Sequence, residues 1–155
     1  MSASVIDPST FDDEWFGLLS DREMLIWIGV FSRLRDDQGR FIENAALARA
    51  RLFPYRDVPV KDVQDAFDRF VLEGRLHRYT AGKHRILQIS TWWEHQKPHW
   101  AAESKLPSPE GWTDRIKTRQ SGSYVSTNWE SRGGFARDLR ANTSCEPFEI
   151  GRAHV

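Results

Sequence analysis

The sequence is poor in cysteine and in long apolar runs. Cys145 is the only cysteine among the 155 residues, which excludes an intrachain disulfide and any zinc site built from several cysteines. The longest apolar run, residues 24–31, is interrupted by Gly29 and is far shorter than the roughly 20 residues that cross a membrane. The N-terminus is acidic and lacks the apolar core of a signal peptide. We therefore expect a cytoplasmic protein with no membrane contact.

Motifs of several enzyme classes are also missing. The sequence has no glycine-rich loop followed by Gly-Lys and Ser or Thr, and it has no HEXXH zinc motif. His95 and His99 are four residues apart, but Pro98 breaks the helix that would align them as metal ligands. We predict no catalytic residue, no cofactor and no metal site, and we do not expect an enzyme.

Charge is balanced overall but unevenly distributed along the chain. The 22 basic and 22 acidic residues give a formal net charge of zero. Residues 1–74 carry 9 basic and 14 acidic groups, a net charge of −5, whereas residues 75–155 carry 13 and 8, a net charge of +5. A basic second half is typical of a protein that binds a polyanion, although a chance distribution explains it equally well.

Apolar spacing predicts a first helix from Ser20 to about residue 34 or 35. The apolar residues that recur at helical intervals are Met24, Trp27, Ile28, Phe31 and Leu34. The run from Ser20 to Glu23 reads as a capping box, and Asp12 is expected to cap a short turn before it. This helix is apolar on nearly every side. It should therefore lie at the centre of a core or be covered by a partner.

Two further helices follow a short extended stretch at residues 40–42. Asn44 is expected to begin the second helix, and Pro54 ends it because the residue before a proline avoids helical backbone angles. The third helix should run from about residue 59 or 60 to residue 73 and stop at Gly74. Its expected buried stripe consists of Val63, Phe67, Phe70 and Val71.

The apolar period then changes to two, which predicts a β-hairpin. Residues 75–80 and 84–90 should form its strands and residues 81–83 its turn. The inward-facing residues are expected to be Leu76, Leu87 and Ile89. The order helix, strand, helix, helix, strand, strand is that of an α+β winged helix-turn-helix, with three helices and a β-hairpin wing.

This order divides the chain into a domain and a tail. We place the winged-helix domain in residues 11–96. Residues 97–149 are rich in proline, tryptophan and basic residues and show no period, so we predict an extended, weakly ordered tail or linker with one short strand at residues 123–127. Residues 150–155, IGRAHV, match one translation of a sequencing-library adapter. We expect them to be non-native, with the natural protein continuing beyond residue 149.

Several segments resemble phage and prophage replication-initiation or replisome-organiser proteins, which have an N-terminal winged helix. The segments are FDDEWFGLLSDREMLIWIGVFSRLRDDQGRF, ALARARLFPY, LEGRLHRYTAGKHRILQISTWWEHQKPHW and PEGWTDR. The resemblance covers roughly residues 11–135, and Arg75 departs from the usual family pattern. It implies a longer protein that binds DNA during replication initiation, with replication proteins among its partners. The resemblance is weaker evidence for function than for the family, because winged helices bind DNA, proteins or both.

Charged side chains predict where DNA would bind. The third helix is poorly suited to the major groove because Asp62, Asp65 and Asp68 would face the phosphates. Cations around the second helix and on the hairpin are better placed: Arg49, Arg51, Arg56, Arg78, Lys83, His84 and Arg85. We expect this set to contact DNA, with the hairpin lying along a groove or the backbone. A charged hairpin that only faces solvent is the alternative.

Tryptophans of the second half offer a further contact. Trp100, Trp112 and Trp129 lie among basic residues and are candidates for stacking on unpaired bases, so the DNA could be duplex or single-stranded. Trp92 and Trp93, at the end of a predicted strand, are instead expected to fold back onto the domain.

Two other functions compete with DNA binding at a replication origin. One is a protein-interaction winged helix, such as a loader adaptor or a phage-borne inhibitor of a host system, which the acidic third helix favours. The other is a transcriptional regulator, which would need a basic reading helix or a dimer. Salt-dependent binding to DNA distinguishes DNA binding from protein binding.

Overall fold

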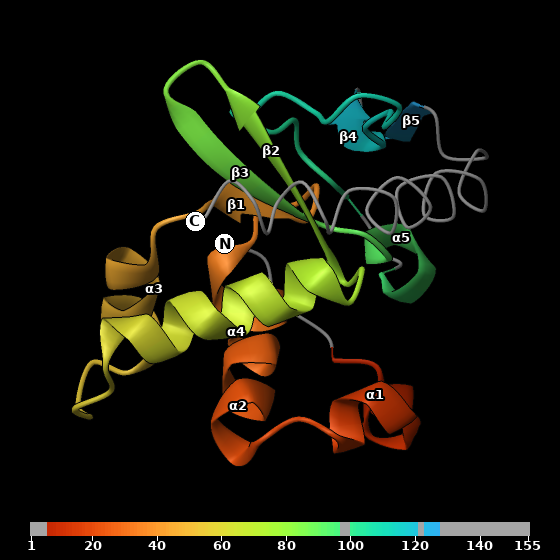
Figure 1. Cartoon of the computed structure of the whole chain (residues 1–155). Coiled ribbons are helices and arrows are strands. Elements are labelled where there is room, and N and C mark those ends of the chain that lie inside the picture. The colour runs from red at the N-terminus through yellow and green to blue at the C-terminus, as the bar shows by residue number, and fades with distance from the viewer. Residues whose placement is uncertain (1–5, 97–99, 121–122, 128–155) are drawn as a thin grey trace. The chain divides into compact units, whose positions relative to one another are not determined.

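The computed structural model describes residues 6–96, 100–120 and 123–127 (Figure 1). Along the chain the elements are η1 (Pro8–Asp12), α1 (Glu14–Gly17), α2 (Asp21–Gly29), η2 (Val30–Leu34), β1 (Arg40–Ile42), α3 (Ala45–Leu52), α4 (Val60–Leu72), β2 (Leu76–Ala81), β3 (His84–Ile89), α5 (Trp92–His95), β4 (Ile116–Gln120) and β5 (Ser123–Thr127). The fold is α+β, with three main helices and an antiparallel three-stranded sheet that contains a β-hairpin. No helix within the described ranges is both long and apolar enough to cross a membrane.

The described residues form two compact units. The first consists of residues 6–35 and 44–68, and the second of residues 36–43 and the described residues from 69 onward. The first unit therefore holds the helices up to most of α4, and the second holds the sheet and the segment that follows it.

The predicted first helix is present as α2 followed by the π-helical turn η2. The Ser20 hydroxyl accepts a hydrogen bond from the Glu23 amide, and the Glu23 carboxylate accepts one from the Ser20 amide at 2.8 Å, so the predicted capping box is confirmed. Ile26 and Val30 are fully buried. In the last turn the Ser32 hydroxyl donates to the Ile28 carbonyl, which satisfies a backbone acceptor where the helix widens.

A short helical segment precedes α2, but its N-cap is Asp13 and not the predicted Asp12. The Asp13 carboxylate accepts a hydrogen bond from the Trp15 amide at 3.0 Å, while Asp12 ends the 3₁₀ helix η1. The Trp15 ring packs edge-on against Trp27 of α2, with the ring centroids 5.0 Å apart. This aromatic pair attaches α1 to α2 within the first unit.

Both remaining helices begin and end close to the predicted residues. The Asn44 side chain accepts a hydrogen bond from the Leu47 amide at 3.0 Å and caps α3, which ends before Pro54. α4 spans Val60–Leu72, and Gly74 follows with a φ of +76°. The predicted buried stripe of α4 is confirmed, since each of its members is almost fully buried: Val63, Phe67, Phe70 and Val71.

The sheet of the second unit has the strand order β1-β3-β2 (Figure 1). The predicted hairpin is confirmed, because Ala81 pairs with His84 across the turn. Its predicted inward-facing residues Leu76, Leu87 and Ile89 are all fully buried. β1 pairs only with residues 86–88 of β3, so the end of the hairpin beyond them is a two-stranded ribbon.

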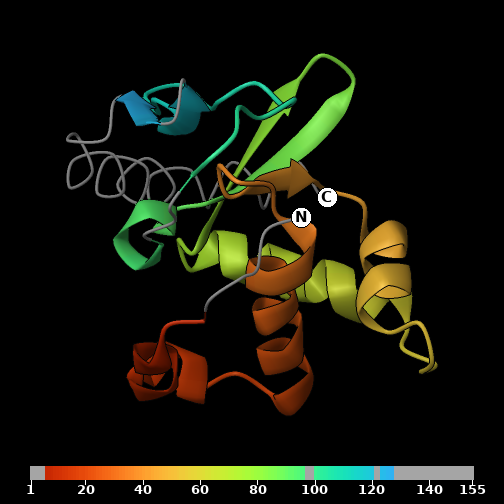
Figure 2. The same cartoon turned by 180° about the vertical axis from the view of Figure 1, so that it is seen from behind.

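Residues 100–118 differ from the weakly ordered tail expected there. Ala101, Trp112 and Arg115 are buried, and β4 pairs with β5 in a second, two-stranded sheet, separate from the first in Figure 2. The predicted strand at residues 123–127 is confirmed as β5. Residues 128–155, including the proposed non-native end, lie outside the described residues.

Arg40 of β1 connects residues 100–118 to the three-stranded sheet. Its guanidinium is fully buried and donates to the Gln88 side chain at 2.9 Å, to the Leu106 carbonyl at 2.9 Å and to both carboxylate oxygens of Asp114. Gln38 donates to the carbonyls of Ala102 at 2.8 Å and Arg115 at 2.9 Å. Gln38 of the loop before β1 and Arg40 of β1 thus supply the hydrogen bonds that hold residues 100–116.

Gly39 lies against the ring of Trp92 with a φ of +78°. A Cβ at Gly39 would come within 2.4 Å of the indole, whereas a Cβ at Gly74, with a nearly equal φ of +76°, meets nothing within 4 Å. We expect Gly39→Ala to lower the free energy of unfolding by about 2 kcal/mol more than Gly74→Ala, because backbone strain is common to both and the steric clash is not. Urea unfolding of the two variants measures the difference, and equal losses would contradict the close contact.

Tyr79 of β2 is partly buried, and its hydroxyl donates to the Pro107 carbonyl. Burial raises the pKa of Tyr79 to about 12. The unfolded chain ionises this group near pH 10. The group therefore stabilises the fold fully below about pH 10, and this contribution disappears as the pH rises towards 12.

An absorbance titration tests this prediction. The tyrosinate absorbance of the native protein minus that of Tyr79→Phe should rise around pH 12, close to the pKa of the folded state. A difference curve centred near pH 10 would show that Tyr79 is exposed in solution.

Candidate nucleic-acid interface

The predicted wing is basic at its tip. Lys83 and His84 are exposed beside the turn at Gly82, and the Arg85 side chain is about half exposed. Lys83 and His84 precede the part of β3 that pairs with β1, so they lie on the two-stranded ribbon. Arg85 lies at the edge of the ribbon, where its carbonyl accepts a hydrogen bond from the Glu43 amide at 2.8 Å. Such a ribbon can enter a groove or follow a phosphate backbone.

Glu43 binds two of the arginines predicted to contact DNA. Arg78 donates to both carboxylate oxygens of Glu43, from Nε at 2.7 Å and from Nη2 at 2.9 Å. Their side chains are only 7% and 2% exposed. Arg85 donates to the same carboxylate at 3.3 Å. In this conformation Arg78 stabilises the hairpin and has no open path to a phosphate, which differs from its predicted role.

Arg49, predicted to contact DNA from the second helix, instead holds the loop between α3 and α4. It donates to the carbonyl of Val58 at 3.0 Å and to that of Arg56 at 3.2 Å, and its guanidinium lies 3.9 Å from the Asp57 carboxylate. The side chains of Arg51 and Arg56 are exposed, so these two remain available for a ligand.

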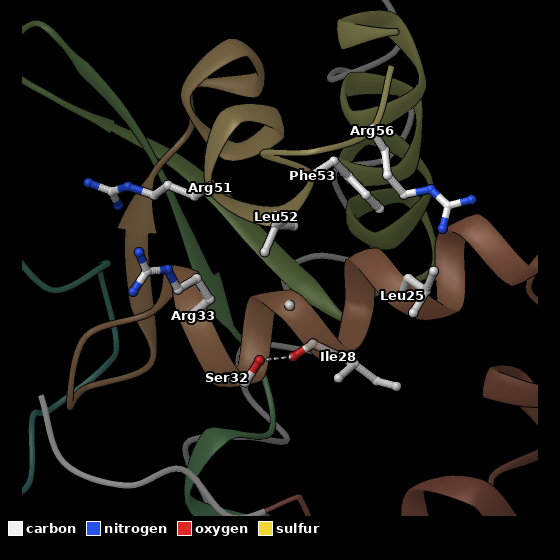
Figure 3. A pocket seen from close by; sticks show the side chains of 9 residues that line it. Leu25, Ile28, Ser32, Arg33, Arg51, Leu52, Phe53 and Arg56 are labelled. Carbon is white, nitrogen blue, oxygen red and sulfur yellow. Dashed lines mark hydrogen bonds between the residues drawn. The ribbon is translucent and has the colours of Figure 1, made fainter. Parts of the chain in front are cut away.

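Arg51 and Arg56 line a pocket of about 410 Å³ in the first unit (Figure 3). Arg33, which is not among the residues predicted to contact DNA, is the third arginine of this pocket. Figure 3 shows Arg33 and Arg51 at one end of the pocket and Arg56 at the other. The pocket is thus bounded by positive charge at both ends.

The floor of this pocket forms where α2 and α3 approach closely. A Cβ at Gly29 would lie 2.5 Å from Cδ2 of Leu52, so glycine permits the approach. The other apolar residues that line the pocket are Leu25, Ile28 and Phe53. A glycine inside an otherwise apolar helix was the sequence signal for a close approach of this kind.

The outer face of α4 carries acidic residues whose basic neighbours are ion-paired. Lys61 contacts Asp65 at 2.7 Å, and this carboxylate raises the pKa of Lys61 through its hydrogen bond and its charge. Arg22 of α2 pairs with Asp62. This face therefore offers little to a phosphate, in line with the expectation from the sequence.

The three tryptophans proposed to stack on bases lie in different surroundings. Trp100 is 45% exposed and keeps an open ring, whereas Trp112 is 5% exposed and presents no face to a base. Trp129 lies outside the described residues. Trp92 and Trp93 are buried, which confirms that they fold back onto the domain.

Comparisons with known protein families, with curated proteins and with solved structures found no match for this chain.

Proposed function

We propose that the chain is a non-catalytic DNA-binding protein of phage or prophage origin that acts in replication initiation, with the β2–β3 hairpin as its DNA-contacting wing. The observation that carries the proposal is the basic tip of a two-stranded ribbon, where Lys83 and His84 are exposed. The role in replication rests on the resemblance of the quoted segments to phage initiation proteins.

The order of the elements supports a winged helix-turn-helix. α2, β1, α3, α4, β2 and β3 follow one another as in that arrangement. The third helix of such a domain ordinarily enters the major groove, but here α4 presents Asp62 and Asp65. We therefore assign the main contact to the wing, which would bind the backbone or the minor groove without reading sequence.

Salt-dependent binding of a labelled DNA duplex tests the proposal. Lys83→Ala combined with Arg85→Ala should weaken binding about equally for unrelated sequences. The slope of log affinity against log salt should flatten by up to about two units, because two phosphate contacts are lost. Arg78 keeps the Glu43 carboxylate paired in this variant, so the wing should stay folded.

The matched control removes the same charge from α4. Lys61→Ala combined with Arg69→Ala should change the slope little, because Asp65 and Glu73 lie beside these cations and repel phosphate. Arg85 differs from them because it shares the Glu43 carboxylate with Arg78, which binds that carboxylate more closely. A flattened slope in the control and an unchanged slope in the wing variant would mean that α4 contacts the phosphates. No duplex binding at low salt would reject DNA binding and favour a protein-interaction domain.

A further inference from the structure

The three arginines of the pocket differ from Arg22 and Arg49 of the same unit. Arg22 pairs with Asp62, and Arg49 lies near Asp57. Among the residues that the structure describes, Arg33, Arg51 and Arg56 form no ion pair. No acidic side chain lines their pocket. Three uncompensated guanidinium groups around one cavity attract a ligand with several negative charges.

Apolar surface lies between these charges. Leu25 is 55% exposed at one end of the pocket, and Ile28 and Leu52 are partly exposed on its floor (Figure 3). The Ser32 hydroxyl is turned towards the Ile28 carbonyl, at 2.8 Å, and is satisfied within the helix. A free phosphate or a sugar-phosphate backbone would leave this aliphatic floor uncovered, so the ligand should carry an apolar group as well as negative charge.

We propose that this pocket is the docking site for an acidic, apolar segment of a protein partner. One bulky apolar side chain of the segment would lie on the floor above Gly29, and its carboxylates would pair with Arg33, Arg51 and Arg56. Guanidinium groups hold carboxylates by paired hydrogen bonds, and apolar anchors flanked by arginine are typical of protein interfaces.

The chemistry of the floor favours a peptide over an unpaired base. Base-binding sites usually present aromatic rings for stacking, whereas this floor is aliphatic and its one aromatic residue, Phe53, is buried. A groove between two helices with an aliphatic floor instead fits an amphipathic helix. This inference uses none of the wing residues, so it can fail while the DNA-binding proposal holds, and the reverse is also true.

Selection from a displayed library of random peptides of about 16 residues tests the inference on the full chain. The selected peptides should be rich in Asp and Glu, with Leu, Ile or Phe at helical spacing. Arg33→Gln, Arg51→Gln and Arg56→Gln together should weaken binding of a selected peptide by about tenfold or more. Leu25→Ser should also weaken it, and this exposed residue can change without disturbing the core.

A control variant removes the same charge elsewhere. Arg22→Gln, Lys61→Gln and Arg69→Gln together should change peptide binding by less than about twofold, since only long-range attraction is altered. The inference is overturned if the selected peptides show no acidic bias, or if the variant of the pocket arginines binds them as well as the native protein does. It is also overturned if that variant loses DNA binding while no acidic peptide is selected.

Discussion

Asp114→Asn is expected to lower the free energy of unfolding by about 3 kcal/mol, because it leaves a buried guanidinium without its counterion. Arg40 is fully buried and donates to both oxygens of the Asp114 carboxylate. The neutral amide of asparagine accepts at one position only and directs an N–H group towards the guanidinium. The contacts of Arg40 with Gln88 and Leu106 remain, but they carry no full negative charge.

Asp65→Asn is the matched control for this prediction. Asp65 also pairs with a cation, but both Lys61 and Asp65 are exposed, so the same substitution should cost no more than about 0.5 kcal/mol. Urea unfolding followed by tryptophan fluorescence measures both losses. If Asp114→Asn cost no more than the control, the Arg40 guanidinium would have to be hydrated in solution, and the attachment of residues 100–116 would rest on Gln38 instead.

Local sequence signals predicted most of the fold because each acts over a few residues. The capping box at Ser20, the cap at Asn44, the stop at Gly74 and the turn at residues 81–83 all depend on neighbours within about four positions. Each of them is present in the structure. The error at the first cap was one residue, since Asp12 and Asp13 are adjacent and both are competent N-caps.

The packing of residues 100–118 could not be predicted in this way. Arg40 and Asp114 are 74 positions apart, and no period or motif connects them. A segment rich in proline and tryptophan is predicted as loop because it lacks regular backbone hydrogen bonds, yet here the buried side chains of Gln38 and Arg40 supply its partners. The same burial removed Trp112 from the candidates for base stacking.

The candidate site was predicted by residue type but not by arrangement. Net charge and position marked Arg51 and Arg78 equally as DNA contacts, and only the structure separates an exposed side chain from one paired with Glu43. The pocket depends on the approach of α2 to α3, which brings Arg33 and Arg51 to the same end of one cavity. The positions of cations in the sequence therefore indicate the charge of a site, but they do not show which surface those cations surround.

Phe67→Ala is expected to lower the free energy of unfolding by about 3–5 kcal/mol, because it removes an aromatic ring from the core and leaves a cavity. Phe67 is 0% exposed and lies one helical turn after Val63 on the inner side of α4. The exposed Leu72 near the end of the same helix provides the control. It is 60% exposed, so Leu72→Ala should cost no more than about 0.5 kcal/mol. Equal losses in urea unfolding would mean that the inner side of α4 is not buried in solution, and the spacing of apolar residues in this helix would then have another cause.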